Sequence, residues 1–399
     1  MAPPPISPRR VALVHDFLLD MRGAERVFEV MCEAFPEADV FTAVYNERGT
    51  LGRFAARAPR ATPLQRLRPT DRTFRAFLPL YPALIEGLDL RGYDLVVSSS
   101  SAWAHGVRVD PGAVHVCYCH NPFRYAWSAR TETLESMPAP LRPVLRAILE
   151  RWRRWDVHAA ERVDRYVANS PVTASRIRDA YGREASVLYP PVATQRFRDR
   201  VGVTPVGDRY VVLTALMRHK HVDVAVRAFT RMGLPLTVIG AGPDRRRLEA
   251  MAGPDVEFLG RVSDERVEEA LLRARALVVT ATEEFGIAGV EAQAAGRPVI
   301  ALRAGGLPDA IVGGVTGTFY DECEPEALEA AVRSFDAAAV DPDDCVASAE
   351  RFNEERFREG LHREVELALE AAREGHPGVS DRLEARRRNA SRARGLTVV

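Results

Sequence analysis

The sequence predicts a doubly wound α/β fold with two domains that face each other across a cleft. The chain has 399 residues, more than one hydrophobic core usually holds. Short apolar segments alternate with amphipathic helical ones, as in parallel sheets that carry helices on both faces. This alternation starts afresh after residues 187–197, where paired prolines and the lack of a helical period are typical of a linker.

The elements follow one another in the order strand, loop, helix. An apolar run at residues 10–17 is followed by a loop with Gly23 and by a helical pattern at residues 24–35. Further buried strands end in small or polar residues. They are predicted at residues 93–101, 113–120, 164–170, 210–216, 235–240, 256–260, 276–282 and 297–303. Functional residues of such sheets gather beyond the carboxyl ends of the strands.

The domain prediction follows from this pattern. We expect an N-terminal domain at residues 1–190 and a C-terminal domain at residues 191–375. Residues 376–399 are rich in arginine and lack apolar periodicity, so they are predicted to form a disordered basic tail. A hydrophobic content of 46% and a charged content of 28% are ordinary for a globular enzyme.

Charge and cysteine content narrow the class of protein. The formal net charge is zero, which argues against a nucleic-acid partner. Five cysteines without framework spacing favour free thiols in a reducing compartment. The N-terminus has no apolar signal core and no run approaches the length of a membrane span. We therefore expect a cytoplasmic protein, with any membrane contact peripheral.

The segment at residues 142–165 combines apolar residues and tryptophans with many arginines. Such a helix suits the surface of an anionic membrane. Equally, arginine stems cover a core-facing stripe in many helices of globular domains. The sequence leaves both readings open.

Two glutamates flank a loop between a strand and a helix. In residues 280–301, Glu283 lies at the strand end and Glu291 lies in the first turns of the next helix. The main-chain N–H groups of residues 285–287 then point from a helix N-terminus towards an anion such as phosphate. Alternatively, Glu291 only complements the helix dipole and Glu283 is a loop carboxylate.

Together with four other segments, this motif resembles the retaining glycosyltransferases of family four. Within that family the likeness is to the bacterial branch that builds surface polysaccharides and includes mannosyltransferases. The resemblance covers residues 10–375 and implies the GT-B fold of two Rossmann-like domains. The other segments read ALVHDFLLDMRGAERVFEVMCEAFPEADVFT, HVCYCHNPFRYAW, ANSPVTASRIRDAYGREASVLYPPVATQRF and VIGAGPDRRRLE with VEFLGRVSDERV.

The resemblance implies roles for the residues of this loop. Glu283 is expected to contact the donor sugar, and Glu291 is expected to hold the ribose of the nucleotide. The main-chain amides of Phe285, Gly286 and Ile287 are expected to bind the diphosphate. Glu284 stands where the family usually has glycine.

Lys220 is the only lysine of the chain, which has 55 Lys and Arg residues in total. The family neutralises the donor diphosphate with an arginine and a lysine spaced five apart, after the first strand of the C-terminal domain. Lys220 matches the lysine, whereas Ala215 replaces the arginine. Arg218, in the same loop, is the candidate for the second cation. The alternative is a slow or degenerate enzyme.

His120 ends a predicted strand, and the family often has a histidine there that contacts the donor sugar. The alternative is a buried, hydrogen-bonded imidazole. With His115, Cys117 and Cys119 it also suggests a metal site, but alternate strand residues face the covering helices, so we predict no metal. Gly23 lets the first loop approach the diphosphate or the acceptor.

We therefore predict a metal-independent, retaining glycosyltransferase without a cofactor. It would move a hexose, with GDP-mannose as the leading donor, to a glycan or lipid-linked acceptor in polysaccharide or glycolipid biosynthesis. The C-terminal domain would bind the nucleotide-sugar donor and the N-terminal domain the acceptor, in the cytoplasm or at the inner face of the cell membrane. The alternatives are a nucleotide-sugar binding protein with weakened transfer activity and a GT-B sugar epimerase.

Overall fold

The computed structural model describes residues 10–70 and 73–374, which form two compact units. The first unit comprises the chain up to Leu188 together with the residues from Arg358 onwards, and the second comprises Tyr189–Phe357. The predicted basic tail at residues 376–399 lies outside the described residues.

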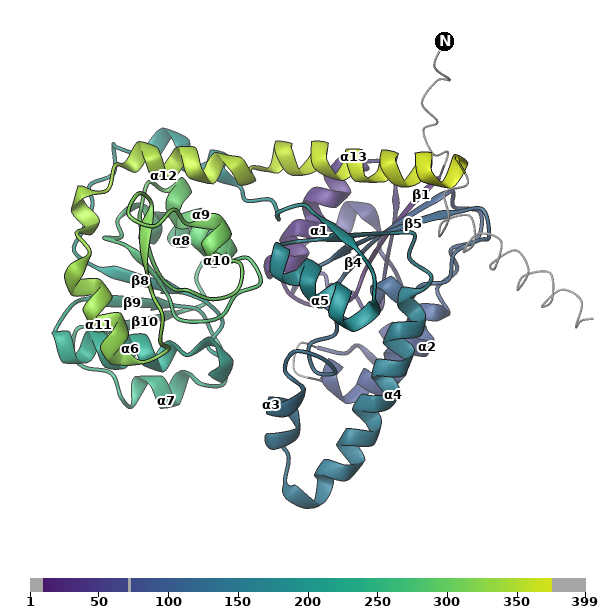
Figure 1. Cartoon of the computed structure of the whole chain (residues 1–399), viewed down its shortest axis with the longest axis horizontal. Helices are drawn as coiled ribbons and strands as arrows, with labels where there is room; N and C mark the ends of the chain where they lie inside the picture. Colours follow the sequence, from purple (N-terminus) through teal and green to yellow (C-terminus); the bar gives the residue numbers. More distant parts are fainter. Residues whose placement is uncertain (1–9, 71–72, 375–399) are drawn as a thin grey trace, which may run out of the picture. The chain divides into compact units, whose positions relative to one another are not determined.

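The first unit contains a seven-stranded sheet in the order β3-β2-β1-β4-β5-β6-β7, in which every pairing is parallel (Figure 1). The strand order reverses between β1 and β4, where His15 pairs with Ser99. The strands are β1 (Val11–His15), β2 (Asp39–Thr42), β3 (Arg60–Ala61), β4 (Leu95–Ser100), β5 (Val114–Cys119), β6 (Arg165–Ala168) and β7 (Ala185–Val187).

Helix α1 packs its apolar face against the sheet. In α1, Val27, Phe28 and Met31 recur at helical spacing and are buried, and the Glu25 carboxylate accepts the main-chain N–H of Arg22 at the N-terminus. The helices are α1 (Gly23–Ala34), α2 (Tyr81–Glu86), α3 (Arg130–Glu135), α4 (Arg142–Ala160) and α5 (Pro171–Tyr181).

The second unit contains a six-stranded parallel sheet in the order β10-β9-β8-β11-β12-β13. This order also reverses once, between β8 and β11. The strands are β8 (Tyr210–Leu213), β9 (Leu236–Ile239), β10 (Val256–Gly260), β11 (Leu277–Val279), β12 (Val299–Leu302) and β13 (Gly317–Tyr320).

Helices lie between the strands of the second unit, and their caps are readable in the sequence. Ser263 caps α8, and Asp341 caps α12 by accepting a hydrogen bond from the main-chain N–H of Asp343. The helices are α6 (Val222–Met232), α7 (Arg245–Glu249), α8 (Asp264–Leu272), α9 (Ile287–Ala294), α10 (Leu307–Ala310), α11 (Pro325–Ser334) and α12 (Pro342–Ala349). The two parallel-sheet units confirm the predicted fold class.

The last helix, α13 (Glu354–Arg373), begins in the second unit and continues in the first. Its later turns bond to the first unit, since Glu364 accepts a hydrogen bond from the Arg165 guanidinium at 2.5 Å, and His362 contacts the main-chain oxygen of Ala34 at 2.9 Å. The predicted C-terminal domain ran to residue 375, whereas in the structure the chain from Arg358 groups with the first unit.

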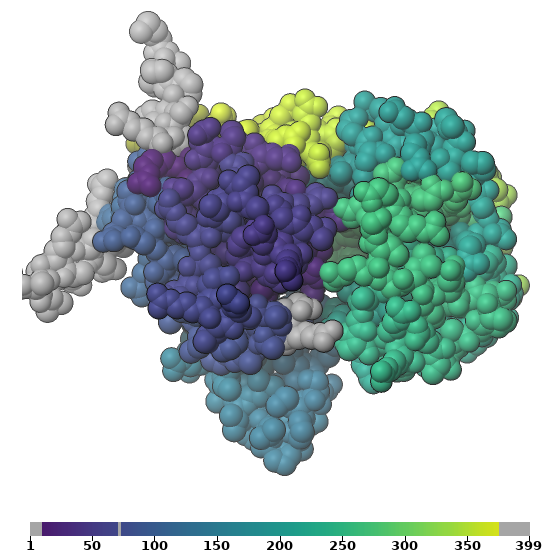
Figure 2. Space-filling view, turned by 180° about the vertical axis from the view of Figure 1, so that it is seen from behind, coloured from purple at the N-terminus to yellow at the C-terminus, as the bar shows by residue number. Residues whose placement is uncertain are grey.

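Helices α3 and α4 contact each other in a hairpin that extends away from the first sheet (Figure 1) and protrudes from the surface of this unit (Figure 2). Leu149 and Trp152 of α4 are buried in the core, and Leu145, Ile148 and Trp155 pack against it. Within residues 10–70 and 73–374, no helix is both long and apolar enough to cross a membrane.

Candidate active site

The point where the second sheet reverses its strand order brings Lys220 and Glu283 together. Lys220 ends the short 3-10 helix Arg218–Lys220 that follows β8, and Glu283 lies in the loop after β11. The Lys220 Nζ donates to both carboxylate oxygens of Glu283, at 2.7 Å each. Their side chains are only 18% and 21% exposed, so water screens this ion pair incompletely.

The loop that carries Glu283 is held by two glycines after β12. The main-chain N–H of Gly306 donates to the oxygen of Glu283 at 2.9 Å, and Gly305 forms a bridge with the same residue. A Cβ on Gly305 would lie 2.0 Å from that oxygen, and one on Gly306 would lie 2.2 Å from the oxygen of Glu284. The two loops can approach this closely only because neither glycine has a side chain.

A second ion pair forms at Glu291 in α9. Arg196, in the 3-10 helix Thr194–Arg200, donates through Nη2 to Glu291 Oε1 at 2.8 Å. The side chains of Arg196 and Glu291 are 19% and 14% exposed. The Arg196 guanidinium also lies 4.6 Å from the ring centroid of Phe197, and its Nε is buried without a hydrogen-bond partner. Sequence reasoning had assigned this arginine only to the linker.

The N-terminus of α9 depends on Gly286, which caps the helix with φ of 96°. A Cβ there would meet the Leu307 side chain at 2.5 Å, so both backbone strain and packing favour glycine. The Phe285 ring is buried between Tyr189 and Phe352, which leaves only its main chain for a ligand. The first N–H groups of the helix, including that of Ile287, have no partner in the preceding turn and suit an anion.

Glu284 and Ala215 are the two departures from the family pattern. Glu284 has no positive φ, so this position does not require glycine. Ala215 is exposed, and the Arg218 guanidinium is exposed in the same loop. Within the described residues, Arg218 makes no ion pair or hydrogen bond through its side chain. Its charge is close enough to contribute, after Arg247, to the lowered pKa of Asp244.

In the first unit, His120 directly follows β5 and lies beside the reversal of strand order. Its Nε2 contacts the Ser99 Oγ at 2.8 Å, and the same Oγ contacts His15 Nδ1 at 3.0 Å. Burial, with the neighbouring His15 ring adding to it, lowers the pKa of His120 to about 3. The ring is therefore neutral near pH 7. Gly23 is the first residue of α1, after β1.

Asp16, which sequence reasoning missed, fixes the loop after β4. It is 1% exposed, and its two carboxylate oxygens accept hydrogen bonds from the main-chain N–H groups of Ser101, Ala102, Trp103 and Ala104 at 2.6–3.0 Å. Its position directly after a buried strand was the available signal. All these hydrogen bonds are made within the protein. Asp16 therefore holds the loop that follows Ser99 against the end of β1.

The alternating residues of β5 are used by the core. Cys117 and Cys119 lie in a hydrophobic cluster with β6 and α5, and burial raises the pKa of Cys117 to about 12. His115 contacts the Ser98 Oγ at 2.8 Å through Nε2. The part of the chain that the structure describes holds no cluster of three His, Cys, Asp or Glu side chains suited to a metal.

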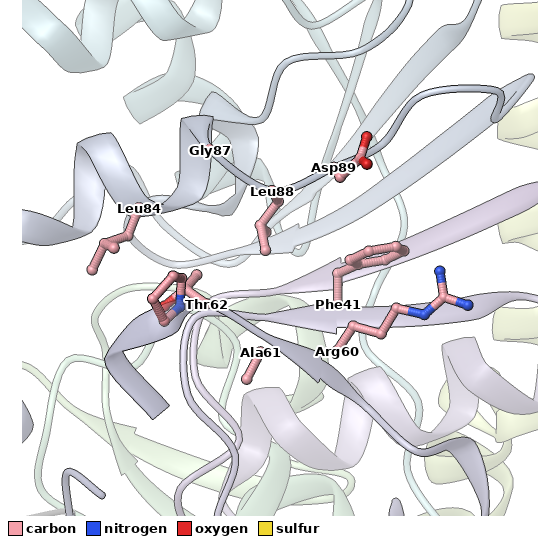
Figure 3. Close-up of a pocket in the computed structure, with 9 residues that line it drawn as sticks. Phe41, Arg60, Ala61, Thr62, Leu84, Gly87, Leu88 and Asp89 are labelled. Atoms are coloured by element: carbon pink, nitrogen blue, oxygen red, sulfur yellow. The ribbon is translucent and has the colours of Figure 1, made fainter. Parts of the chain in front are cut away.

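A shallow hollow of about 360 Å³ lies beside β3, at the edge of the first sheet (Figure 3). Phe41, Leu84 and Leu88 line it, and the Arg60 guanidinium beside it donates to Asp39 at 3.1 Å. It includes none of the predicted site residues.

Comparison with known proteins adds independent information on the two units. The family model described as Glycosyltransferase Family 4 matches residues 21–196, and the one described as Glycosyl transferases group 1 matches residues 198–351. Together these matches take in most of both units.

Two curated relatives have names that specify a reaction. The GDP-mannose-dependent α-(1-6)-phosphatidylinositol monomannoside mannosyltransferase of Mycolicibacterium smegmatis is 32% identical over 222 residues, which cover 48% of this chain and 56% of its own. The D-inositol 3-phosphate glycosyltransferase of Acidothermus cellulolyticus is 30% identical over 244 residues, covering 52% of this chain and 53% of its own. The alignments thus span about half the length of these relatives.

Among solved structures, the sucrose-phosphate synthase of Thermosynechococcus elongatus is similar with a TM-score of 0.67. The match covers 91% of this chain and 100% of that one at 16% sequence identity. At this identity the likeness concerns the fold alone, and it extends over both α/β units.

Proposed function

Because the chain belongs to the family-four glycosyltransferases of the GT-B fold, we propose that it transfers a hexose from a nucleotide diphosphate sugar to a glycan or lipid-linked acceptor. The observation that carries this proposal is the pairing of Lys220 with Glu283 at the strand reversal of the second sheet. In doubly wound sheets, ligands bind beyond the carboxyl ends of the strands at this point.

The arrangement suits the two ends of a nucleotide sugar. Lys220 supplies a point charge for the diphosphate, and Glu283 supplies acceptors for sugar hydroxyls. The N-terminus of α9, with Gly286 and Ile287, provides N–H donors for phosphate oxygens. Glu291, kept in place by Arg196, accepts hydrogen bonds from ribose hydroxyls. When the diphosphate binds, Lys220 shifts from Glu283 to the phosphate oxygens and frees the carboxylate for the sugar.

Transfer is aided most by groups that bind the departing nucleoside diphosphate more tightly than the bound substrate. Negative charge grows on that leaving group, and Lys220 and Arg218 are the cations placed to stabilise it. We propose that transfer retains the configuration at the anomeric carbon. In front-face attack the leaving phosphate takes the acceptor proton, so no side-chain base, resident metal or cofactor is required.

Mannose, with GDP as the nucleotide, is the donor we propose first. The support is the relative from Mycolicibacterium smegmatis, whose name specifies GDP-mannose. We assign the donor to the second unit, which carries both signature glutamates, and the acceptor to the first unit. The names of both relatives make inositol-containing acceptors the first probes.

Peripheral contact with an anionic membrane remains part of the proposal, on a narrower basis than the sequence suggested. The apolar stripe of α4 packs on the unit's own core. Exposed residues of the α3–α4 hairpin include Leu141 and Val144, at 49% and 61%, and Arg146 and Arg151, with the carboxylates of Glu132, Glu135 and Glu150 also exposed. Vesicles with and without anionic lipid test this contact, and Arg146→Glu should weaken any binding that depends on charge.

A nucleotide-sugar binding protein with weakened transfer is the second candidate. Ala215 motivates it, because one of the two diphosphate cations of the family is missing at this position. Arg218 is free within the described part of the loop to supply the missing charge. The two candidates therefore differ in whether Arg218 contributes to turnover.

The first experiment is calorimetric titration with GDP-mannose, GDP, UDP-glucose and UDP, each with and without EDTA. We expect GDP and GDP-mannose to bind in both conditions. The same protein is then incubated with the bound donor and an inositol phosphate, a phosphatidylinositol mannoside or a mannoside. NMR of the product gives the anomeric configuration.

Each result decides one part of the proposal. Binding of no nucleotide would overturn the donor site, and loss of binding in EDTA would overturn metal independence. Donor binding without transfer to any acceptor would favour the binding-protein candidate. An inverted product would refute retention while leaving the donor site intact.

A further inference from the structure

One hydroxyl group lies between two imidazole rings at the strand reversal of the first unit. Ser99 Oγ is 3.0 Å from His15 Nδ1 and 2.8 Å from His120 Nε2. Ser99 is 0% exposed and His15 is 2% exposed. The residues come from β1, β4 and the end of β5, which are adjacent in the sheet, and His15 is stacked on Phe28 with centroids 4.8 Å apart. Both rings are thus held in place relative to the hydroxyl.

Counting protons restricts how this trio bonds. A hydroxyl donates one hydrogen bond, and a neutral imidazole donates through one nitrogen and accepts through the other. While both rings are neutral, Ser99 can donate to His15 and accept from His120, or it can donate to His120 and accept from His15. If it accepted from both rings, its own buried proton would have no acceptor among these groups, which is unfavourable.

Glu25 decides between the first two arrangements. Its Oε1 lies 3.9 Å from His15 Nε2, and its side chain is 14% exposed. The position of Glu25 is itself fixed, because its Oε2 accepts the main-chain N–H of Arg22 at 3.1 Å at the start of α1. A carboxylate attracts an N–H and repels a lone pair at this distance. A neutral His15 therefore carries its proton on Nε2 and accepts the Ser99 proton at Nδ1.

The consequence reaches His120. Since the Ser99 hydroxyl points at His15, its oxygen accepts a hydrogen bond from His120 Nε2–H. The other bonds of His120 are through its main chain, to Ser100 and to Thr173. Within the described residues, Nδ1 of His120 is left as an acceptor, and the side chain is partly exposed.

We propose that Glu25, His15 and Ser99 are positioning residues that fix His120 as its Nε2–H tautomer, so that Nδ1 accepts a hydrogen bond from a hydroxyl group of the substrate. The assignment of the His120 tautomer follows from these contacts and does not depend on which reaction the protein catalyses. The assignment of the bound hydroxyl to a sugar rests on the proposed function. An acceptor at this position selects a substrate that has a hydroxyl there over one that lacks the proton.

The tautomer is tested on the full chain without any substrate. Long-range ¹H–¹⁵N NMR distinguishes protonated from unprotonated imidazole nitrogens, and His120→Gln assigns the His120 signals among the nine histidines. We expect His120 to be protonated at Nε2 alone near pH 7. Ser99→Ala should give a mixture of tautomers or the Nδ1–H form, and Glu25→Gln should shift His15 towards Nδ1–H.

Matched controls separate this effect from loss of structure. Ser98→Ala removes a contact of the same length in the same strand, from Ser98 Oγ to His115 Nε2 at 2.8 Å, and should leave His120 unchanged. Ser99→Thr keeps the hydroxyl and should restore the tautomer if the added methyl group is accommodated, as thermal unfolding will show. A wild-type His120 protonated at Nδ1, or one unaffected in a folded Ser99→Ala variant, would overturn the proposal.

The substrate contact is tested by turnover. Ser99→Ala should lower kcat roughly tenfold, as for other residues that orient a functional histidine, with GDP affinity unchanged. Donors in which one sugar hydroxyl is replaced by fluorine identify the group bound by Nδ1. One such donor should be turned over slowly by the wild type. The Ser99→Ala substitution should lower the turnover of that donor little further, because the contact is already missing. Equal losses in both proteins for every fluorinated donor would refute the sugar contact, and absence of any turnover would refute the proposed function but not the tautomer.

Discussion

At the residue scale, the partner of Lys220 explains what its ammonium contributes. The Lys220 ammonium donates to both oxygens of Glu283, and the same charge-assisted donors suit the oxygens of a diphosphate. Lys220→Ala should lower kcat by roughly 10²–10³-fold, as for loss of one donor to a transition-state charge. Steady-state kinetics and GDP calorimetry measure the effect.

The control for this prediction is the carboxylate itself. Lys220→Ala leaves Glu283 without its cation, so part of the loss reflects an uncompensated charge near the phosphates. Adding Glu283→Gln removes that charge and should recover GDP affinity but not turnover. Turnover unchanged in Lys220→Ala would contradict the role of this residue.

Arg196 gives a second prediction at the same scale. Truncation of a partner in a partly buried, charge-assisted hydrogen bond costs about 1.5 kcal/mol or more. Arg196→Ala should therefore weaken GDP binding roughly tenfold, because Glu291 is no longer held for the ribose. Arg198→Ala is the matched control. The Arg198 side chain is 62% exposed, and its Nη2 lies 3.7 Å from Glu350 Oε1, which is too far for a hydrogen bond. Equal affinity in both variants would contradict a positioning role for Arg196.

The site residues differ in how far the sequence could identify them. Lys220, Glu283 and Glu291 are singled out by the resemblance to the family, whose motif they match, and the structure brings the first two into contact. Arg196 could not be identified, since its partner lies 95 residues further along the chain. The Ser99 hydroxyl is one of several in a serine run, and only the strand pairing shows which of them meets His120.

At the scale of elements, the loop after β12 sets the position of Glu283. Gly305 has φ of 66°, and a Cβ there would lie 2.0 Å from the main-chain oxygen of Glu283. A non-glycine residue in the left-handed conformation costs about 1–2 kcal/mol. Gly305→Ala should destabilise the second unit by more than this amount, because of the added clash, and should weaken donor binding. Gly314→Ala is the control, because Gly314 has φ of 81° with open space around it. Thermal unfolding and GDP titration separate the two effects, and equal results for both variants would contradict the prediction.

Helix α4 is attached to the first unit by a buried carboxylate. Asp156 is 0% exposed, and its Oδ2 accepts hydrogen bonds from Trp127 Nε1 at 2.6 Å and from the Tyr181 hydroxyl at 2.8 Å. Asp156→Ala leaves one buried and one partly buried donor without an acceptor and should cost about 3 kcal/mol. Glu150→Ala on the exposed face of α4 should change the midpoint of thermal unfolding little. Similar midpoints for the two variants would contradict this account.

The sequence predicted those strands that are buried on both faces and therefore consist of continuous apolar runs. The nine predicted strands are all present, because apolar runs in a sheet covered on both faces are continuous. Strands β2, β3, β7 and β13 were not predicted. They have two to four residues each, lie towards the sheet edges, and gain their strand conformation from pairing rather than from their own pattern. The inward-facing stripe of α4 likewise depends on a tertiary partner that periodicity cannot identify.

At the scale of the whole molecule, the boundary near residue 190 was readable from the proline pair, whereas the return of α13 to the first unit was not. The amphipathic pattern of α13 shows that one face is buried but not against which unit. Glu364 bonds to Arg165 at 2.5 Å and to Ser186 at 2.6 Å, and these partners precede it by 199 and 178 residues in the sequence. Such pairings follow from the fold and not from local propensity.

The division into two units predicts that binding and turnover are separable. Lys220, Glu283, Glu291 and Arg196 all belong to the second unit, whereas His120 belongs to the first. His120→Ala should therefore leave the dissociation constant of GDP within about twofold, because the nucleotide contacts proposed here are all retained. Transfer should fall by roughly 10²-fold, the lower range for loss of one positioned polar group. Calorimetry and product formation measure the two quantities on one preparation.

The reverse pattern is expected for the second unit, where Arg196→Ala should reduce GDP affinity while leaving the His120 tautomer unchanged in NMR spectra. Each variant thus has one property that should change and one that should not. If His120→Ala abolished GDP binding in a protein that still unfolds at the wild-type temperature, the nucleotide would depend on the first unit. The assignment of the nucleotide to the second unit would then be wrong.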